Sequence, residues 1–523
     1  MNYTEVFNDI ENNKNLLQNL EKLINQRKNV RHGKEQYLSS IIQIILKNDP
    51  NITTYIESII TDIKETDIQN EIIKVLNLKK RNDPNTKSII YKLYNKEQLS
   101  ENDIELFVSM SLEPNIYSLM LTTILNLIKF KGLDLDSQYL LSLKMAESGK
   151  TFDYRNSPSF QNKKLLRRYP TGGVSEKIAL IMPALLKCLT KEYDFVSPFL
   201  VAKTLSFTGG TWDKLSSIPN FSFPDPGLDS INLLSKDGVC MTVAHKDYNP
   251  SDTNLYQLRS ITNTVDSLPL IITSIASKQI ANPVDTLMLD VRYGKNAFLK
   301  NLKSANSFFD QIKPLLRMFG IDTIAEFTET NTWYGSSVGN YLEVIESICL
   351  MRNVSTYSDL EFDSNLLDQQ KTLVIKMTAK LIAKQFSIHP SIVEQKCINL
   401  FANNNVYLAF KEILKSHGVC DETIFKIDNT LPFTNTFNIK EFRVNAHKNG
   451  IIEEINQKNI GSFVNIKLQA GSNFFKKENR FLEGVLLLKP EQSIVQKGET
   501  LALVFSTDDL EVEVLSQEFF KIN

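Results

Sequence analysis

The chain reads Arg-Arg-Tyr-Pro-Thr-Gly-Gly-Val-Ser-Glu-Lys over residues 167–177 and then continues into an apolar helical stretch. A Thr-Gly-Gly turn before a helix exposes backbone N–H groups with no Cβ in the way, and such a turn suits an anion. A Gly-Gly turn is also compatible with a plain tight connection. A second turn of this kind, flanked by hydroxyl side chains, lies within Ser206–Leu215. Two such loops in one domain predict a site that holds one phosphate from two sides.

Strands and helices alternate around these loops. The segment Val284–Val291 predicts a strand, which a glycine turn and a helix over Phe298–Leu316 follow. This alternation predicts an α/β sheet. From about residue 433, short β-rich segments stand between Gly, Asn and Pro turns and predict a small β-rich C-terminal domain. These segments are Phe442–Ala446, Gly450–Ile452, Phe463–Leu468, Gly484–Leu488 and Leu501–Phe505.

The chain before the loops has a helical pattern. Residues 1–85 carry apolar side chains at helical spacing and predict a small helical module. Further on, Ser100 and Asp103 precede an apolar run in the manner of a helix N-cap. The apolar stretch Tyr117–Lys131 has helical length, and Gly132 is a plausible end.

Composition bounds the function classes. The chain has 523 residues, of which 42% are hydrophobic and 23% charged, and its formal net charge is −1. This length predicts about three domains, and the charge gives no reason to expect nucleic acid or a membrane as partner. The five cysteines are scattered without a CxxC pair, and the five histidines form no cluster, so no metal site is predicted. With no signal peptide and no long apolar run, we expect a cytoplasmic protein.

A third motif places charged and aromatic side chains at helical spacing. If both halves of residues 255–278 are helical, Tyr256 and Arg259 share one helix face, and Ser274 and Lys278 share another. Two such faces suit a flat base that is rich in carbonyl groups. The alternative is that Arg259 and Lys278 are surface charges.

Taken together, these motifs resemble the thymidine/pyrimidine-nucleoside phosphorylase family. The family's signature loop reads Asp-Lys-His-Ser-Thr-Gly-Gly-Val-Gly-Asp-Lys and aligns with residues 167–177. The resemblance runs in order from about residue 87 to the end. It includes Thr208–Leu215, Pro250–Asp252, Leu255–Arg259, Thr264–Leu270, Leu289–Gly294 and Val338–Val344.

The resemblance implies a fold of the α/β class with an additional all-α domain. The helical extension is residues 1–85, and a helical domain for base binding and dimerisation comprises 86–150 and 247–280. An α/β phosphate-binding domain comprises 151–246 and 281–430, and a small α+β domain comprises 431–523. The active site would be the cleft between the helical and α/β domains, and the protein would be a homodimer.

The resemblance also implies the site residues. The pyrimidine contacts fall on Tyr256, Arg259, Ser274 and Lys278, and the catalytic groups on Arg259, Lys278 and Arg168. The phosphate contacts fall on Arg168, Thr171, Gly172, Gly173, Lys203 and Thr211. The phosphate end departs from the family at several positions, where hydroxyl donors and a histidine are replaced. Tyr169 stands for the histidine, Pro170, Ala179 and Val201 for serines, and Lys203 for an arginine.

The implied reaction is cleavage of the N-glycosidic bond of a pyrimidine nucleoside by phosphate, which is the co-substrate; no cofactor is expected. One alternative is an inactive sensor or scaffold that binds a pyrimidine nucleoside or nucleotide, with a protein partner on residues 1–85. Another is hydrolysis or transfer to a different acceptor, in which Glu176 or Tyr169 handles protons or positions water. The resemblance further places Glu346 and the turn at Gly335 where some family members hold a monovalent cation.

Overall fold

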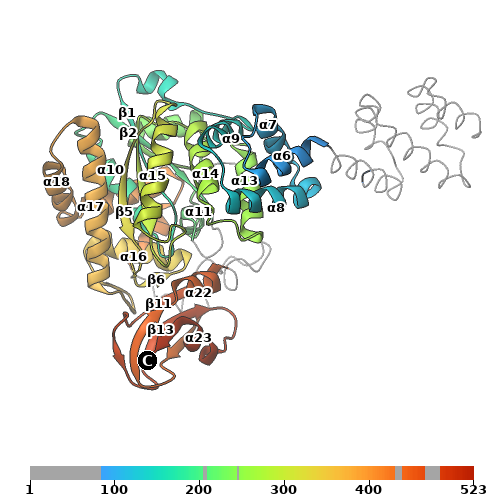
Figure 1. Ribbon diagram of the computed structural model, residues 1–523. Coiled ribbons are helices and arrows are strands. Elements are labelled where there is room, and N and C mark those ends of the chain that lie inside the picture. The colour runs from blue at the N-terminus through green and yellow to red at the C-terminus, as the bar shows by residue number, and fades with distance from the viewer. Residues whose placement is uncertain are drawn as a thin grey trace, which may run out of the picture. The chain divides into compact units, whose positions relative to one another are not determined.

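The structure is a computed structural model (Figure 1) that describes residues 73, 84–203, 209–243, 247–331, 333–429, 439–465 and 483–523. The predicted helical module at 1–85 falls almost wholly outside the described residues, as do Ser206–Thr208 of the second Gly-Gly loop. The chain divides into two compact units, Met1–Leu127 and Ile128–Asn523.

In the first unit, the described part is helical. Helices α6 (Pro84–Asn95) and α7 (Glu101–Leu112) precede α8 (Pro114–Lys131), which extends past the boundary of the unit. The predicted N-cap is confirmed, because the Ser100 side chain accepts from the Asp103 backbone N–H and Asp103 accepts from the Ser100 backbone in return. The predicted end of α8 is also confirmed, since Gly132 follows with φ +88°.

The second unit is built on a five-stranded parallel sheet with the order β3-β2-β1-β4-β5. Its strands are β1 (Lys164–Pro170), β2 (Phe195–Val201), β3 (Val239–Val243), β4 (Thr286–Tyr293) and β5 (Asp322–Glu329). Along β1 to β4 nearly every residue is buried, including Arg167 and Arg168 on β1, which is typical of a parallel sheet with both faces covered. The predicted mixed α/β fold is therefore present, and its central sheet is parallel.

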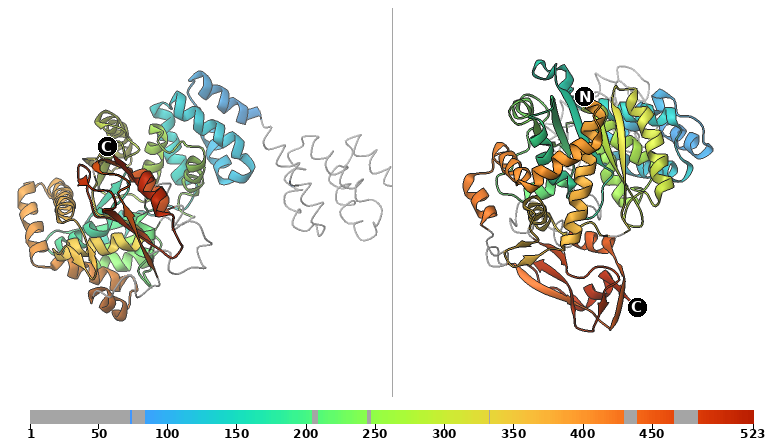
Figure 2. Two further views of the ribbon diagram at one scale, coloured as in Figure 1. Left: turned by 90° about the horizontal axis from the view of Figure 1, so that it is seen from below. Right: turned by 90° about the vertical axis from the view of Figure 1, so that its left-hand side faces the viewer.

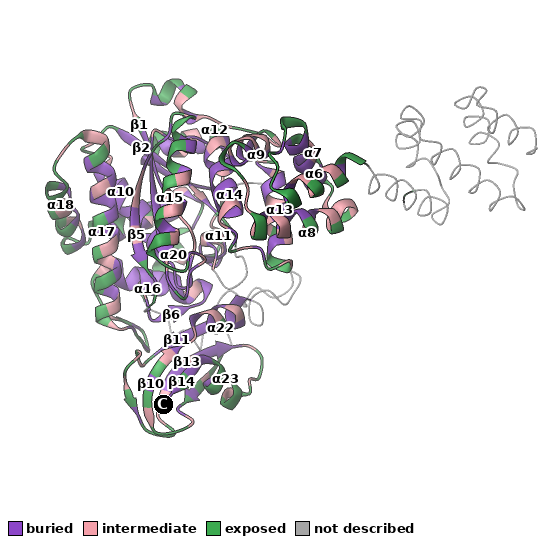
Figure 3. Cartoon of the chain, in the orientation of Figure 1, coloured by how far each residue is buried: buried purple, intermediate pink, exposed green. Residues whose placement is uncertain are grey.

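Neighbouring residues of each strand enter opposite cores. On β1, Leu166 belongs to a core with Phe199 and Met288, and Leu165 belongs to another with Val196 and Leu287. This alternation follows from the period of two along a strand. Helices cover both faces of the sheet, as Figures 1 and 2 show, and the buried residues follow the sheet and the inner helix faces (Figure 3).

The helices around the sheet fall into two groups. The first core involves α10 (Ile178–Leu189), α16 (Asn340–Arg352), α17 (Ser364–Phe386), α18 (Pro390–Ala402), α19 (Asn405–Ser416) and α20 (Asp421–Asp428). The second core involves α14 (Leu268–Ala281) and α15 (Leu302–Arg317), with contacts from α9 (Leu135–Glu147) and α12 (Leu228–Asp237). Shorter or peripheral elements are η3 (Tyr154–Asn156), η4 (Pro158–Phe160), α11 (Thr211–Ser216), α13 (Pro250–Ile261), β7 (Thr356–Tyr357) and β8 (Leu360–Glu361).

The C-terminal part contains two small sheets. One has the order β6-β11-β13-β9 and the other β12-β10-β14. Their strands are β6 (Ser337–Val338), β9 (Lys440–Asn445), β10 (Gly450–Ile455), β11 (Gly484–Leu487), β12 (Ile494–Val495), β13 (Thr500–Ser506) and β14 (Phe520–Ile522), with α22 (Gln457–Ser462) and α23 (Val512–Phe519) beside them. The β6 strand comes from the central part of the chain and completes the larger of these sheets.

Several predicted boundaries need correction. The strand predicted at Val284–Val291 is Thr286–Tyr293, and the helix predicted from Phe298 begins at Leu302 because Asn301 caps it. The segment predicted as β-rich from Phe463 continues the helical backbone of α22 over 463–465, and its remainder lies outside the described residues. Both Phe463 and Val464 are buried, so an apolar run alone did not distinguish a short strand from a helix end. The predicted domain boundaries stay predictions.

Among the described helices, none is both long and apolar enough to span a lipid bilayer.

Candidate functional site

The site lies where the order of the parallel strands reverses. The chain goes from β1 outward to β2 and β3, and then returns to β4 on the other side of β1. Ligands of open α/β sheets bind at such a point, beside the carboxyl ends of the strands. The loop after β1 begins at Thr171, and the segment after β2 begins at Ala202. The two predicted Gly-Gly turns therefore leave neighbouring strands at one edge of the sheet.

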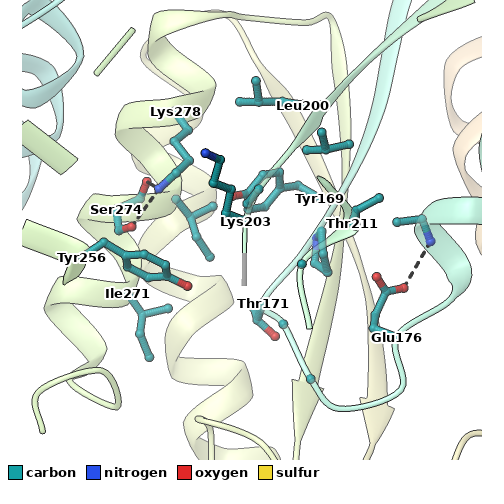
Figure 4. A pocket seen from close by; sticks show the side chains of 18 of the residues that line it. Tyr169, Thr171, Glu176, Leu200, Lys203, Thr211, Tyr256, Ile271, Ser274 and Lys278 are labelled. Carbon is teal, nitrogen blue, oxygen red and sulfur yellow. Dashed lines mark hydrogen bonds between the residues drawn. The ribbon is translucent and has the colours of Figure 1, made fainter. Parts of the chain in front are cut away.

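A cavity of about 110 Å³ opens at this edge (Figure 4). In Figure 4, Tyr256, Ser274 and Lys278 line one side, and Thr171, Thr211 and Glu176 lie toward the other. Every predicted site residue lines this cavity: Arg168, Thr171, Gly172, Gly173, Lys203, Thr211, Tyr256, Arg259, Ser274 and Lys278. The side formed by α13 and α14 is called the base wall below, and the side formed by the ends of β1 and β2 is called the anion end.

On the base wall, Lys278 is held in a defined position. Its Nζ donates to the Ser274 Oγ at 3.0 Å and to the Ser274 backbone carbonyl at 3.2 Å, and it forms an ion pair with Asp252. Asp252 is itself fixed, because its backbone N–H donates to the Oδ1 of Asn249, the N-cap of α13. The Lys278 side chain is 14% exposed, so the ammonium still faces the cavity.

Arg259 is oriented by the loop between α13 and α14. Its Nη1 donates to the Leu270 carbonyl at 3.0 Å and its Nη2 to the Val265 carbonyl at 2.9 Å. Its Nε has no hydrogen-bond partner among the described residues. Burial lowers the pKa of this guanidinium from its usual value. The alternative that Arg259 is a surface charge is wrong, because the side chain is buried and lines the cavity.

The Tyr256 ring lies below both cations. Its centroid is 5.6 Å from the Arg259 Cζ and 5.4 Å from the Lys278 Nζ. These distances are within the range of cation–π attraction. Burial raises the pKa of Tyr256 to about 12, so its hydroxyl stays protonated and is able to donate a hydrogen bond. An aromatic face, a hydroxyl and two cations can together recognise a planar ligand with carbonyl oxygens.

At the anion end, the loop after β1 is tied to β4. The Thr171 backbone N–H donates to the Asp290 carbonyl at 3.0 Å, and the Thr171 Oγ1 accepts from the Arg292 backbone N–H at 2.9 Å. Gly172 has φ +94°, which favours glycine. At Gly173, a Cβ would meet Arg292 Cδ and Nη1 at 3.3 Å. The two glycines thus allow both the turn and its close approach to an arginine.

Beneath this loop lies a buried cluster of two arginines and two carboxylates. Arg168 Nη2 donates to Glu176 Oε1 at 3.0 Å and forms an ion pair with Asp290. Arg292 contacts the same two carboxylates, through Nε to Asp290 at 3.1 Å and through Nη2 to Glu176 at 3.6 Å. Each positive charge therefore has negative charge beside it before any ligand binds.

The cluster shifts the pKa values of its members. Burial opposes ionisation of Glu176, but the charges of Arg168, Arg292 and Lys214 outweigh it and lower the pKa to about 2. Burial disfavours the charge on Arg292 too, yet Asp290 and Glu176 raise its pKa overall. Arg168 Nε and Nη1 have no hydrogen-bond partner among the described residues, although both atoms are buried. These two N–H groups are unused donors beside the cavity.

The segment after β2 adds a third cation to Arg168 and Arg292. The Lys203 Nζ lies 4.4 Å from the centroid of the Trp212 ring, and the Lys203 side chain borders the cavity with Thr211. Pro170, Ala179 and Val201 also line this end, where none of them offers a side-chain hydrogen bond. Burial, with the nearby Asp252 charge, raises the pKa of Tyr169, which also lines the cavity. The anion end therefore combines cations and backbone N–H groups with few hydroxyl donors.

Sequence reasoning did not assign roles to three members of the site. Asp252 pairs with Lys278, Asp290 pairs with Arg168, and Arg292 lies against the turn at Gly173. All three stand in segments that carry the family resemblance, Pro250–Asp252 and Leu289–Gly294. For Asp290 and Arg292, the missing signal was the register of the parallel strands, which sets Arg168 beside Met288 and Pro170 beside Asp290.

The monovalent-cation position expected at Glu346 and Gly335 does not suit such an ion in this chain. The Lys177 Nζ lies 3.1 Å from Glu346 Oε2, and a Cβ on Gly335 would be 2.4 Å from the same Nζ. A second cation in this place would be repelled by the ammonium. Within the described residues, no group of three or more His, Cys, Asp or Glu side chains is arranged to hold a metal ion.

Comparison with known proteins extends these observations. Residues 200–384 match the family described as "Glycosyl transferase family, a/b domain". The chain is 30% identical over 417 residues to a thymidine phosphorylase of Mycoplasmoides pirum, covering 79% of this chain and 93% of the relative. It is 27% identical over 418 residues to a pyrimidine-nucleoside phosphorylase of Staphylococcus haemolyticus, covering 80% of this chain and 91% of that protein.

Among solved structures, the chain is similar to the anthranilate phosphoribosyltransferase of Thermus thermophilus. The TM-score is 0.46 and the identity 11%, over 63% of this chain and 99% of that chain. This likeness is too distant to add to the assignment.

Proposed function

Because the chain belongs to the thymidine/pyrimidine-nucleoside phosphorylase family, we propose that it cleaves the N-glycosidic bond of a pyrimidine nucleoside with phosphate. The products are the free base and a pentose 1-phosphate. The observation that supports this most is the cavity lined by both the base-wall and the anion-end residues. Phosphate is the co-substrate, and the reaction needs no cofactor.

In this proposal, the base wall acts on the leaving group. Arg259 and Lys278 bind the carbonyl oxygens and N3 of the pyrimidine, and the Tyr256 ring packs beside it. The base gains negative charge as its bond to C1′ breaks, so two cations stabilise the transition state more than the bound nucleoside. Their fixed orientation, set by Ser274, Asp252 and backbone carbonyls, lowers the cost of reorganisation during the reaction.

The anion end holds the nucleophile. The candidate donors at this end are the backbone N–H groups of Gly172 and Gly173, Arg168 through its Nε and Nη1, and Lys203 with Thr211. Phosphate bound there would attack C1′ on the side opposite the departing base. The loss of three hydroxyl donors, at about 1.5–3 kcal/mol for each hydrogen bond to a charged group, predicts a weak affinity for phosphate.

The test is base release from thymidine, deoxyuridine and uridine with and without excess phosphate. We expect base release that depends on phosphate. The Arg259→Ala variant should release base more slowly by about two to three orders of magnitude. Arg317→Ala, on the exposed end of α15, is the matched control and should retain full activity. Calorimetric titration of the same nucleosides measures binding apart from turnover.

A second function is favoured by the charges around Arg168. Its guanidinium already contacts Asp290 and Glu176. The side chains of Pro170, Ala179 and Val201, which offer no hydrogen bond, line the place where phosphate would bind. This arrangement suits a sensor or scaffold that binds a pyrimidine nucleoside or nucleotide without turnover. Tight calorimetric binding without base release at any phosphate concentration would establish this reading and refute phosphorolysis.

Hydrolysis through Glu176 has less support. A carboxylate with a pKa of about 2 is a weak base, and it already pairs with Arg168 and Arg292.

We further propose a homodimer and a protein partner for residues 1–85. Sedimentation of the full chain tests the homodimer, and a chain lacking residues 1–85 shows whether that segment takes part in self-association or is left for a partner.

A further inference from the structure

We propose that the Lys177 ammonium is a built-in monovalent cation that holds the Thr171–Lys177 loop in place. Lys177 is the last residue before α10, and its side chain is fully buried, as is that of Glu346 on α16. The inference concerns how this loop is supported, and its test does not require the proposed reaction.

The surroundings of the ammonium consist of oxygen atoms. The Nζ donates to the Ser175 Oγ and to the Ser337 carbonyl at 3.1 Å, lies 3.4 Å from the Ser175 carbonyl, and pairs with Glu346 Oε2 at 3.1 Å. Carbonyl, hydroxyl and carboxylate oxygens are also the ligands that hard cations take in proteins. A lysine ammonium is a compact point charge with three donors, so it suits the same set of ligands.

The rest of the cluster is satisfied as well. Glu346 accepts from the Ser336 backbone N–H at 2.9 Å, from the Ser337 backbone N–H at 2.8 Å, and from Gln370 Nε2 at 3.2 Å. Neither Lys177 nor Glu346 has an unpaired buried polar atom among the described residues. In a buried ion pair that meets this condition, the mutual attraction and the additional hydrogen bonds can offset the cost of removing both charges from water.

Two backbone positions are adapted to the ammonium. Gly335 leaves room for it, since a Cβ there would come within 2.4 Å of the Nζ. Ser175 adopts φ +58°, a left-handed conformation that is costly for a residue with a side chain. Its Oγ donates to the Ser337 carbonyl at 2.9 Å and accepts from Lys177. The strained conformation of Ser175 therefore occurs at the residue whose hydroxyl contacts the Lys177 ammonium.

Through this cluster the loop is joined to elements that are distant in sequence. Ser337 belongs to β6, which pairs with β11, and Val174 of the loop lies in the same core as Val338. On the other side, Lys214 at α11 pairs with Glu343 Oε2 at 2.7 Å and donates to the Glu176 carbonyl. Lys177 thus acts as a positioning residue for the turn that lines the anion end.

The experiment compares thermal unfolding of the full chain in potassium chloride and in choline chloride at equal ionic strength. We expect the wild type to have the same Tm in both salts. Lys177→Ala should lower the Tm by about 5 °C or more in choline chloride, because it leaves the Glu346 carboxylate buried without its partner. Potassium, ammonium or methylammonium should restore at least half of this loss with a saturating dependence, and tetramethylammonium should not.

Two matched variants separate this role from a general need for a buried lysine. Lys177→Met removes the charge but fills the space, so it should be destabilised without rescue by potassium. Lys187→Ala breaks another buried pair, with Asp237 at 2.7 Å, and should show the same Tm in potassium and choline. A Lys177→Ala variant without specific rescue would overturn the proposal. So would a wild type whose Tm rises in potassium, which remains measurable even if Lys177→Ala does not fold.

Discussion

The base wall and the anion end face one cavity but are built in different ways. On the base wall, each cation is oriented mainly by neutral groups, with Asp252 as the carboxylate that pairs with Lys278. At the anion end, Arg168 and Arg292 share two carboxylates in a fully buried cluster. With two cations and one carboxylate, the base wall keeps a net positive charge that can meet a ligand, whereas two carboxylates balance Arg168 and Arg292 at the anion end.

The largest effect should come from breaking the base wall. Under the proposed function, Lys278→Ala removes one of the two cations that would stabilise the departing base, and it leaves Asp252 buried without its partner. We expect kcat/KM for the nucleoside to fall by about 10²–10³. The KM for phosphate should change little, because Lys278 belongs to the other wall. Lys384→Ala, on the exposed side of α17, is the control, and an equal loss in both variants would contradict this division of roles.

The next largest effect should be a dependence of stability on pH that arises at the anion end. The pKa of Glu176 is lowered in the folded chain to about 2 from 4.5, so its ionisation stabilises the fold above pH 4.5. This contribution is lost progressively as the pH falls from 4.5 towards 2, when the carboxylate is protonated. The Tm of Glu176→Gln should be lower than that of the wild type at pH 7, and the gap should narrow across this window.

The control for acid is a carboxylate on the surface. Glu422 pairs with Lys426 on α20, and this hydrogen bond and charge lower its pKa, but both side chains are exposed. Glu422→Gln should therefore follow the wild type at every pH. A constant gap between Glu176→Gln and the wild type from pH 7 to 3 would show that Glu176 is not the group that titrates.

A smaller effect should come from repairing the anion end. Ala179 lines the cavity at the start of α10, and Ala179→Ser adds a hydroxyl donor there. One hydrogen bond to a charged group is worth about 1.5–3 kcal/mol, so the KM for phosphate should fall by about tenfold or more. The KM for the nucleoside should not change. Ala402→Ser, at the exposed end of α18, is the control, and an unchanged phosphate KM would place the anion elsewhere.

The smallest effect is expected at Lys203. Its side chain is exposed and its ammonium lies over the Trp212 ring, where a cation–π contact contributes about 0.5–1 kcal/mol. Lys203→Met should weaken phosphate binding by roughly twofold to fivefold, and added salt should reduce the difference between variant and wild type. Lys191→Met, which is also exposed, should leave the isotherm unchanged in calorimetric titration of phosphate.

The sequence predicts the base wall more completely than the anion end, for a physical reason. Tyr256, Arg259, Ser274 and Lys278 stand on helices, where spacing alone sets which side chains share a face. The Arg168 cluster depends on the register between β1 and β4, which brings residues more than a hundred positions apart into contact. Local sequence carries no record of that register. The same holds for Lys177, whose partner Glu346 is supplied by α16.

The strand β6 has a consequence for how the molecule assembles during synthesis. Ser337 and Val338 leave the ribosome with the central part of the chain, but their partner β11 spans Gly484–Leu487 and follows much later. The sheet whose core includes Val174 therefore cannot close until Gly484–Leu487 has been made. A nascent chain that stops short of β11 would contain every residue of the cavity. It would still lack the sheet against which the Thr171–Lys177 loop packs. We expect the competent site to appear late in translation, as one of the last parts of the molecule to mature.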